Sequence, residues 1–204
     1  QAALVQENRS TLELIQEVSR SVVGIRAEGR NADAADTTSF GTGFVVDAER
    51  GLVLTVEYSV SDRDGVSIID NAGAVRRATI VASDEGFGLA LLRVEGGFDH
   101  ALSFAPAAPQ AGEEAFAVGR VVDGRTLFVG QGIVSVFFPS PNPTLTLSFH
   151  FPRGTGGAPV VNQRGQVVGI ALLLHNRETG ELAPTGWAIG SATVQSWLST
   201  IGDR

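Results

Sequence analysis

The 204-residue sequence contains no cysteine and no lysine, and all 15 of its positive charges are arginines. Without cysteine, the chain cannot form a disulfide, use a thiolate nucleophile or bind zinc through sulfur. Without lysine, it can form neither a Schiff base nor a Ser-Lys catalytic pair. No run of 18 or more apolar residues is present, so the sequence predicts no transmembrane span.

The three histidines, His100, His150 and His175, are not spaced as zinc ligands on one helix, so we expect no metal and no cofactor. The formal net charge is -7, which disfavours a nucleic-acid partner because phosphate binding needs clustered positive charge. What the chain does contain is 43% apolar residues and 25 glycines, which suit a sizeable core with many tight turns.

One helix is predicted within the first twenty residues. The segment from Ser10 to Glu13 has the pattern of a capping box, and Leu12, Ile15 and Val18 follow at helical spacing. The tail from residue 191 to 204 is predicted as a short closing helix. Between the two helices, the pattern is one of short apolar strands.

These strands occur in two series, separated by a Gly- and Pro-containing segment at 97–112. Many short strands with regular turns are typical of barrels and sandwiches. We therefore expect one all-β domain with two barrels, at 21–96 and 113–190, and a polar loop at 29–38. Expected strands span 22–27, 40–46, 52–56, 66–69, 75–82, 89–94, 115–118, 127–138, 144–149, 159–162, 166–174 and 186–189.

Four segments carry a family resemblance: SFGTGFVV at 39–46, LVLTVEYSV at 52–60, SDEGFGLALLRV at 83–94 and GTGGAPVVN at 154–162. In this order they resemble the HtrA/Deg branch of the trypsin-like serine proteases. GQVVGI at 165–170 and TGWAIGS at 185–191 extend the resemblance to nearly the whole chain. It implies two six-stranded antiparallel β-barrels, with the active site in the cleft between them.

The resemblance also places the three residues of a catalytic triad. Serine proteolysis needs a hydroxyl nucleophile, an imidazole base and a carboxylate that orients the base. Here the imidazole position is Tyr58, the carboxylate position is Gly88 and the nucleophile position is Gly156. A phenol is a poor base near neutral pH, and glycine has no side chain. The sequence therefore predicts a natural, catalytically inactive pseudoprotease with a binding, scaffold or regulatory role.

Two parts of such a site do not depend on the triad. The oxyanion turn of the family maps to Gly154, Thr155 and Gly156, whose backbone N–H groups remain. Because this turn is rich in glycine and is followed by Ala158, we expect it to be malformed or mobile. In the family, a peptide pairs as an extra strand with the segment that here comprises Ala171, Leu172, Leu173 and Leu174.

Several alternatives remain open. The three leucines at 172–174 can all belong to the core, and Tyr58 can serve as an aromatic plug of the vacated histidine space. The chain can also be a weak hydrolase with a rearranged site, in which Thr155 acts with His150. A third hypothesis is an oligomerisation domain that assembles through the apolar helix at Leu12 to Val18.

The resemblance implies several features outside the domain. Relatives of this type act outside the bacterial cytoplasm, so the resemblance implies a periplasmic or otherwise extracytoplasmic location, either free or tethered to the membrane by an upstream segment. Many relatives carry a PDZ domain after the protease domain, which here would begin near Arg204. A homo-oligomer and a protein or peptide partner of unknown identity are expected on the same ground.

Overall fold

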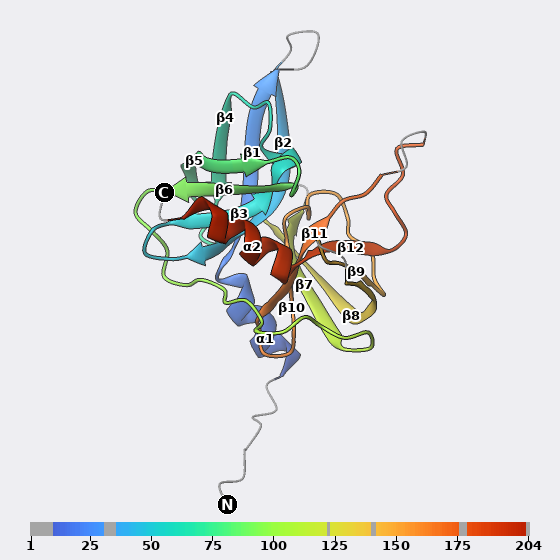
Figure 1. The fold of residues 1–204 in the computed structure, drawn as a ribbon. Coiled ribbons are helices and arrows are strands. Elements are labelled where there is room, and N and C mark those ends of the chain that lie inside the picture. Colours follow the sequence, from blue (N-terminus) through green and yellow to red (C-terminus); the bar gives the residue numbers. More distant parts are fainter. Residues whose placement is uncertain (1–9, 31–35, 122, 140–141, 176–178, 203–204) are drawn as a thin grey trace, which may run out of the picture.

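The described part of the chain folds into two closed antiparallel barrels of six strands each, which confirms the predicted all-β fold (Figure 1). The structure is a computed structural model that describes residues 10–30, 36–121, 123–139, 142–175 and 179–202. The first barrel has the strand order β1-β2-β3-β6-β5-β4 and the second β10-β11-β12-β9-β8-β7. The elements are α1 (Thr11–Ser19), β1 (Val22–Arg30), β2 (Asp36–Asp47), β3 (Leu52–Val56), the 3-10 helix η1 (Glu57–Ser59), β4 (Gly65–Ile69), β5 (Val75–Asp84), β6 (Leu89–Val94), β7 (Glu114–Val121), β8 (Thr126–Phe138), β9 (Thr144–Leu147), β10 (Pro159–Val161), β11 (Val167–Leu172), β12 (Gly186–Gly190) and α2 (Ser191–Ile201).

Three apolar cores explain why so many strand residues are buried on both faces. Each barrel has its own interior, and a third core lies between the barrels. Strand β3 is buried at every position because Val53 faces the interior of the first barrel, whereas Leu52 and Leu54 face the core between the barrels. Helix α2 runs across the junction of the barrels and adds Val194 and Trp197 to that core (Figure 1).

Helix α1 begins with the predicted capping box. The backbone N–H of Glu13 donates to Ser10 Oγ at 3.2 Å, and the N–H of Ser10 donates to Glu13 Oε2 at 3.0 Å. The expectation that Leu12 belongs to the apolar face was wrong, because Leu12 is 66% exposed and Leu14 is buried beside Ile15 and Val18. At 3.6 residues per turn, a residue four positions before Val18 shares its face, and one six positions before does not. Residues 1–9 of the predicted N-terminal segment and residues 203–204 of the tail lie outside the described residues.

At its described ends, residues 29–30 and 36–38, the predicted loop is strand. Strands β1 and β2 remain paired through Gly29 with Thr37, and Thr37 Oγ1 donates to the carbonyl of Gly29 at 3.2 Å. β-branched residues favour extended backbone, and this pairing outweighed the polar composition on which the loop was predicted. Residues 31–35 of the predicted loop lie outside the described residues.

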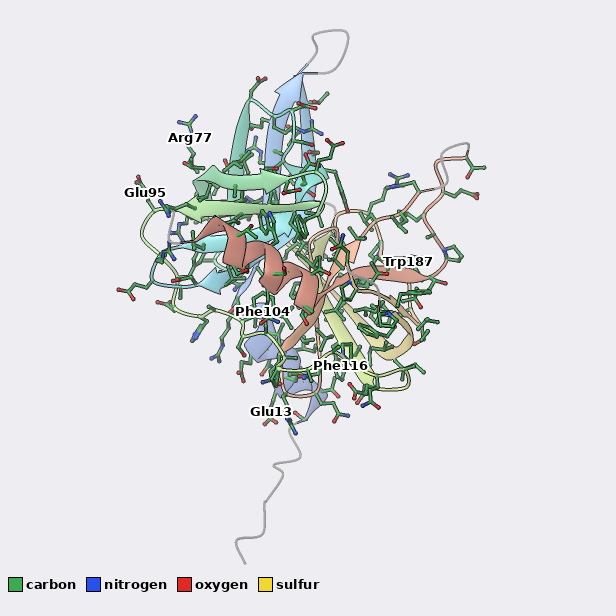
Figure 2. All side chains as sticks on the ribbon, in the orientation of Figure 1. Glu13, Arg77, Glu95, Phe104, Phe116 and Trp187 are labelled. Atoms are coloured by element: carbon green, nitrogen blue, oxygen red, sulfur yellow. The ribbon has the colours of Figure 1, made fainter. Side chains whose placement is uncertain are left out.

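The segment between the barrels packs closely on the second barrel. The N–H of Ala105 donates to the carbonyl of Val167 at 2.9 Å, and the N–H of Val167 donates to that of Ser103 at 2.8 Å. Phe104 packs against the core between the barrels, to which Phe116 of β7 also belongs (Figure 2). No helix in the described ranges is long and apolar enough to cross a membrane.

Candidate functional site

The strand pairing of the first barrel brings two of the three triad positions together. Tyr58 lies in η1, directly after the end of β3, and Gly88 lies directly before the start of β6. Because β3 and β6 are antiparallel neighbours, these two strand ends meet at one end of the barrel. The backbone N–H of Glu57 donates to the carbonyl of Gly88 at 2.9 Å. Gly88 has a φ of +68°, a conformation that side-chain-bearing residues rarely adopt.

The third position, Gly156, comes from the second barrel and lies against Tyr58. A Cβ atom built on Gly156 would be 2.2 Å from Tyr58 Oη, well inside van der Waals contact. The phenol hydroxyl therefore occupies the space in which a side chain at position 156 would begin. A glycine at this position is the residue that leaves room for the hydroxyl.

A hydrogen bond holds the hydroxyl of Tyr58 in this position. The backbone N–H of Leu173 donates to Tyr58 Oη at 3.1 Å. Although the whole residue is 43% exposed, its hydroxyl end is desolvated by the surrounding chain, and burial raises the pKa of Tyr58 to about 12. At neutral pH the phenol is protonated and is a hydrogen-bond donor rather than a base.

Hydrogen bonds also anchor the turn that maps to the oxyanion hole. Its carbonyl groups bind the first barrel: the N–H of Thr42 donates to the carbonyl of Gly156 at 2.9 Å, and Thr42 Oγ1 donates to that of Gly154 at 2.9 Å. The N–H of Gly157 donates to the carbonyl of Ala171 at 2.9 Å. The structure thus shows one well-connected conformation of the turn, and its expected mobility stays a prediction. Sequence reasoning assigned no role to Thr42, because nothing in its strand motif signals a contact with the second barrel.

The alternative catalytic pair is not assembled. Thr155 is fully buried, and its hydroxyl donates to the carbonyl of Pro152 at 2.7 Å. His150 is exposed, as are His100 and His175. These positions agree with the interpretation of all three histidines as surface residues. Within the described ranges, no group of three or more histidine or acidic residues could hold a metal ion.

In the segment predicted to form a peptide groove, some backbone groups already hydrogen-bond within the chain. Ala171 is buried and hydrogen-bonds on the β10 side, where its N–H donates to the carbonyl of Ala158 at 2.8 Å. Leu172 and Leu173 are half-buried and Leu174 is 43% exposed, so the three leucines are not all core. The carbonyl of Leu174 accepts the N–H of Ala183 at 2.8 Å, and β11 ends at Leu172, earlier than predicted.

Two hollows in the described part of the chain bear on where a ligand could bind. The larger, of about 660 Å³, is lined by α1, by the segment between the barrels and by the turn before β11, and none of the triad positions lines it. The smaller lies between Phe151, Leu173 and Leu182, of which Leu173 hydrogen-bonds to Tyr58, and it is too narrow to admit a water molecule.

Two closed six-stranded barrels with the site in the seam between them define the class of trypsin-like protease domains. The family model described as a trypsin-like peptidase domain matches residues 41–170, and the chain belongs to this family. A solved structure, the active form of the Rv3671c protease from M. tuberculosis, shares the fold with a TM-score of 0.78. It is 21% identical and the match covers 93% of this chain and 84% of that one.

The curated relatives are of the Deg type, which confirms the resemblance. Serine endoprotease DegS of Escherichia coli K12 is 26% identical over 202 residues, covering 93% of this chain and 56% of DegS. A probable periplasmic serine endoprotease DegP-like of Ectopseudomonas mendocina is 30% identical over 158 residues, covering 74% of this chain and 32% of that protein. The chain thus spans between one third and somewhat over one half of the length of these relatives.

Because Tyr58 is the only tyrosine of the chain, its titration can be measured directly. We expect the phenolate absorbance of the folded protein to appear with a pKa of about 12, and that of the urea-unfolded chain near the ordinary value of 10.0. The folded state then binds a proton that the unfolded state has lost, so stability falls as the pH rises from 10.0 to about 12. An ordinary pKa in the folded protein would show that the hydroxyl is not desolvated.

Proposed function

We propose that this domain is a pseudoprotease that binds a peptide or protein segment at the former active site and does not cleave it. The observation that carries the proposal is the position of Tyr58 Oη, which fills the space where a side chain at Gly156 would begin. A nucleophile cannot be placed there while the phenol is present. The binding role rests on the resemblance and on the N–H groups of Gly154 and Gly156, which have no acceptor among the described residues.

The chemistry of the three positions supports inactivity. General-base catalysis requires a group that is deprotonated near neutral pH, and Tyr58 is protonated there because its pKa is raised to about 12. Gly88 and Gly156 offer neither a carboxylate nor a hydroxyl. What remains of the site is backbone hydrogen-bonding capacity, which is sufficient for peptide binding but does not supply a nucleophile.

The structure gives no support to either alternative function that the sequence left open. A hydrolase that uses Thr155 with His150 would need an accessible hydroxyl, and that of Thr155 is buried and already donates to Pro152. An oligomerisation domain that assembles through α1 would need a free apolar face, and most of that face packs within the chain. Among the large apolar residues of α1, Leu12 is the exposed one.

The proposal extends to the setting of the domain. The curated relatives include proteins named as probable periplasmic endoproteases, so we propose an extracytoplasmic location for this chain. A downstream PDZ domain, an upstream membrane tether and a homo-oligomeric state remain part of the proposal on the ground of resemblance alone.

The test is incubation of the protein with unfolded casein for a day, followed by mass spectrometry of the products. We expect no products from the wild type, and the same from Thr155→Ala and His150→Ala as matched controls. Biolayer interferometry with immobilised casein measures binding in the same samples, and we expect a reversible signal. Products that disappear in either variant would contradict the proposal, because they would reveal a relocated catalytic centre. Absence of casein binding would contradict the binding role.

A further inference from the structure

Three hydrogen-bond donors at the former active site have no acceptor among the described residues. Tyr58 Oη accepts the N–H of Leu173, while its own hydrogen is not donated to any described group. The backbone N–H groups of Gly154 and Gly156 likewise lack an acceptor in the described part of the chain. Tyr58 Oη lies directly against Gly156, and Gly154 belongs to the same turn, two residues earlier.

The arrangement of these donors suits a negatively charged oxygen. Turns that contain a residue at positive φ present successive N–H groups as a concavity that binds anions, and Gly154 has a φ of +93°. The bond from Leu173 occupies one lone pair of Tyr58 Oη and thereby limits the directions in which its hydrogen can point. At neutral pH the phenol keeps that hydrogen, because burial raises its pKa.

A second set of unused groups lies beside the donors. The carbonyl of Leu173 and the N–H of Leu174 form one peptide unit that has no partner within the described residues. An extended peptide can pair with such a unit as a short additional strand.

We propose that the site binds the free C-terminal carboxylate of an extended peptide. The carboxylate accepts hydrogen bonds from Tyr58 and from the N–H groups of Gly154 and Gly156, and the preceding residues pair with the unit between Leu173 and Leu174. This inference rests on the proposed function, since it specifies which peptides the inactive site recognises. Tyr58 is then a binding residue that provides a donor where the family's relatives carry out hydrolysis.

The experiment uses two fluorescein-labelled peptides of the sequence Val-Thr-Val-Ala-Val-Ala, one with a free carboxylate and one with a C-terminal amide. Fluorescence polarisation with the whole chain measures both dissociation constants. Hydrogen bonds to a charged group are the stronger ones, so we expect the acid to bind about tenfold tighter than the amide, or more. In Tyr58→Phe, which keeps the ring and removes the donor, we expect the preference to fall to about twofold. Ser199→Ala, which removes an exposed hydroxyl from α2, should leave the preference unchanged.

Heteronuclear NMR with N-acetylalanine and its amide gives a second, sequence-independent measurement. Shifts of the Gly154 and Gly156 amide signals with the acid alone would support the inference. Equal affinity of acid and amide, or a full preference for the acid in Tyr58→Phe, would overturn it while leaving the peptide-binding function in place. If neither peptide binds and casein does not bind either, the proposed function itself fails together with this inference.

Discussion

Replacement of Gly157 by alanine is expected to lower the free energy of unfolding by about 3–5 kcal/mol, the largest effect of any single change at the turn. Gly157 has a φ of +89°, where a side chain is strained. Its added Cβ would lie 2.1 Å from the carbonyl oxygen of Thr42 and 2.6 Å from Thr55 Oγ1. Both atoms belong to adjacent strands of the first barrel and are joined by a 2.7 Å hydrogen bond, so neither moves easily. Urea unfolding followed by tryptophan fluorescence measures the loss.

The matched control is Gly112→Ala. Gly112 has a similar φ of +93°, but an added Cβ would have nothing within 4 Å. The loss in the free energy of unfolding of Gly112→Ala therefore reports backbone strain alone, and we expect it to be about 1–2 kcal/mol. The difference between the two variants measures how tightly the turn packs on β2. Equal losses in the two variants would show that the contact with Thr42 does not exist in solution.

Replacement of Thr42 by valine is expected to cost about 2–4 kcal/mol, although valine has nearly the same shape. The hydroxyl of Thr42 is fully buried and accepts the N–H of Arg120 at 2.8 Å, while it donates to the carbonyl of Gly154 at 2.9 Å. Valine leaves both of these backbone groups without a partner in a buried place, and each such group costs about 1–3 kcal/mol. The same urea experiment provides the measurement.

Thr38→Val is the control for this change, because Thr38 lies on the same strand and is exposed. We expect its effect to remain within about 0.5 kcal/mol. The Thr42 variant should also weaken binding of the carboxylate peptide, since the turn that carries the N–H groups loses its anchor. A stability loss for Thr42→Val no larger than that for Thr38→Val would mean that the hydroxyl does not connect the two barrels.

The helices and strands were predictable from the sequence because their signals are largely local, whereas the two six-stranded barrels were expected from the family resemblance. Alternating or continuous apolar runs of strand length predict β-structure, and the capping box predicts the start of α1. The sequence-based predictions were wrong where tertiary packing decides which residues are buried or paired. Leu12 fits a helical spacing as well as Leu14 does, and only the surface against which α1 packs distinguishes them. The strand ends at 29–30 and 36–38 were missed because cross-strand pairing outweighed their polar composition.

The site was predictable only in part. Alignment of motifs identified Tyr58, Gly88 and Gly156 as the triad positions, but it did not show where the phenol points. The sequence suggested Tyr58 as an aromatic plug, but its contact with Gly156 is a matter of tertiary geometry. The engaged backbone groups of the predicted groove, at Leu173 and Leu174, left no signal in the sequence because they involve main-chain atoms.

By itself, the sequence determined the chemistry that is absent and the elements that are present. A glycine supplies no carboxylate and no hydroxyl in any fold, and strand periodicity follows from the geometry of the chain. Only the tertiary structure decided that Tyr58 Oη meets Leu173, 115 positions further along, and that it fills the space at Gly156. Such contacts depend on how two closed barrels pack against each other, and the local pattern of residues does not encode that arrangement.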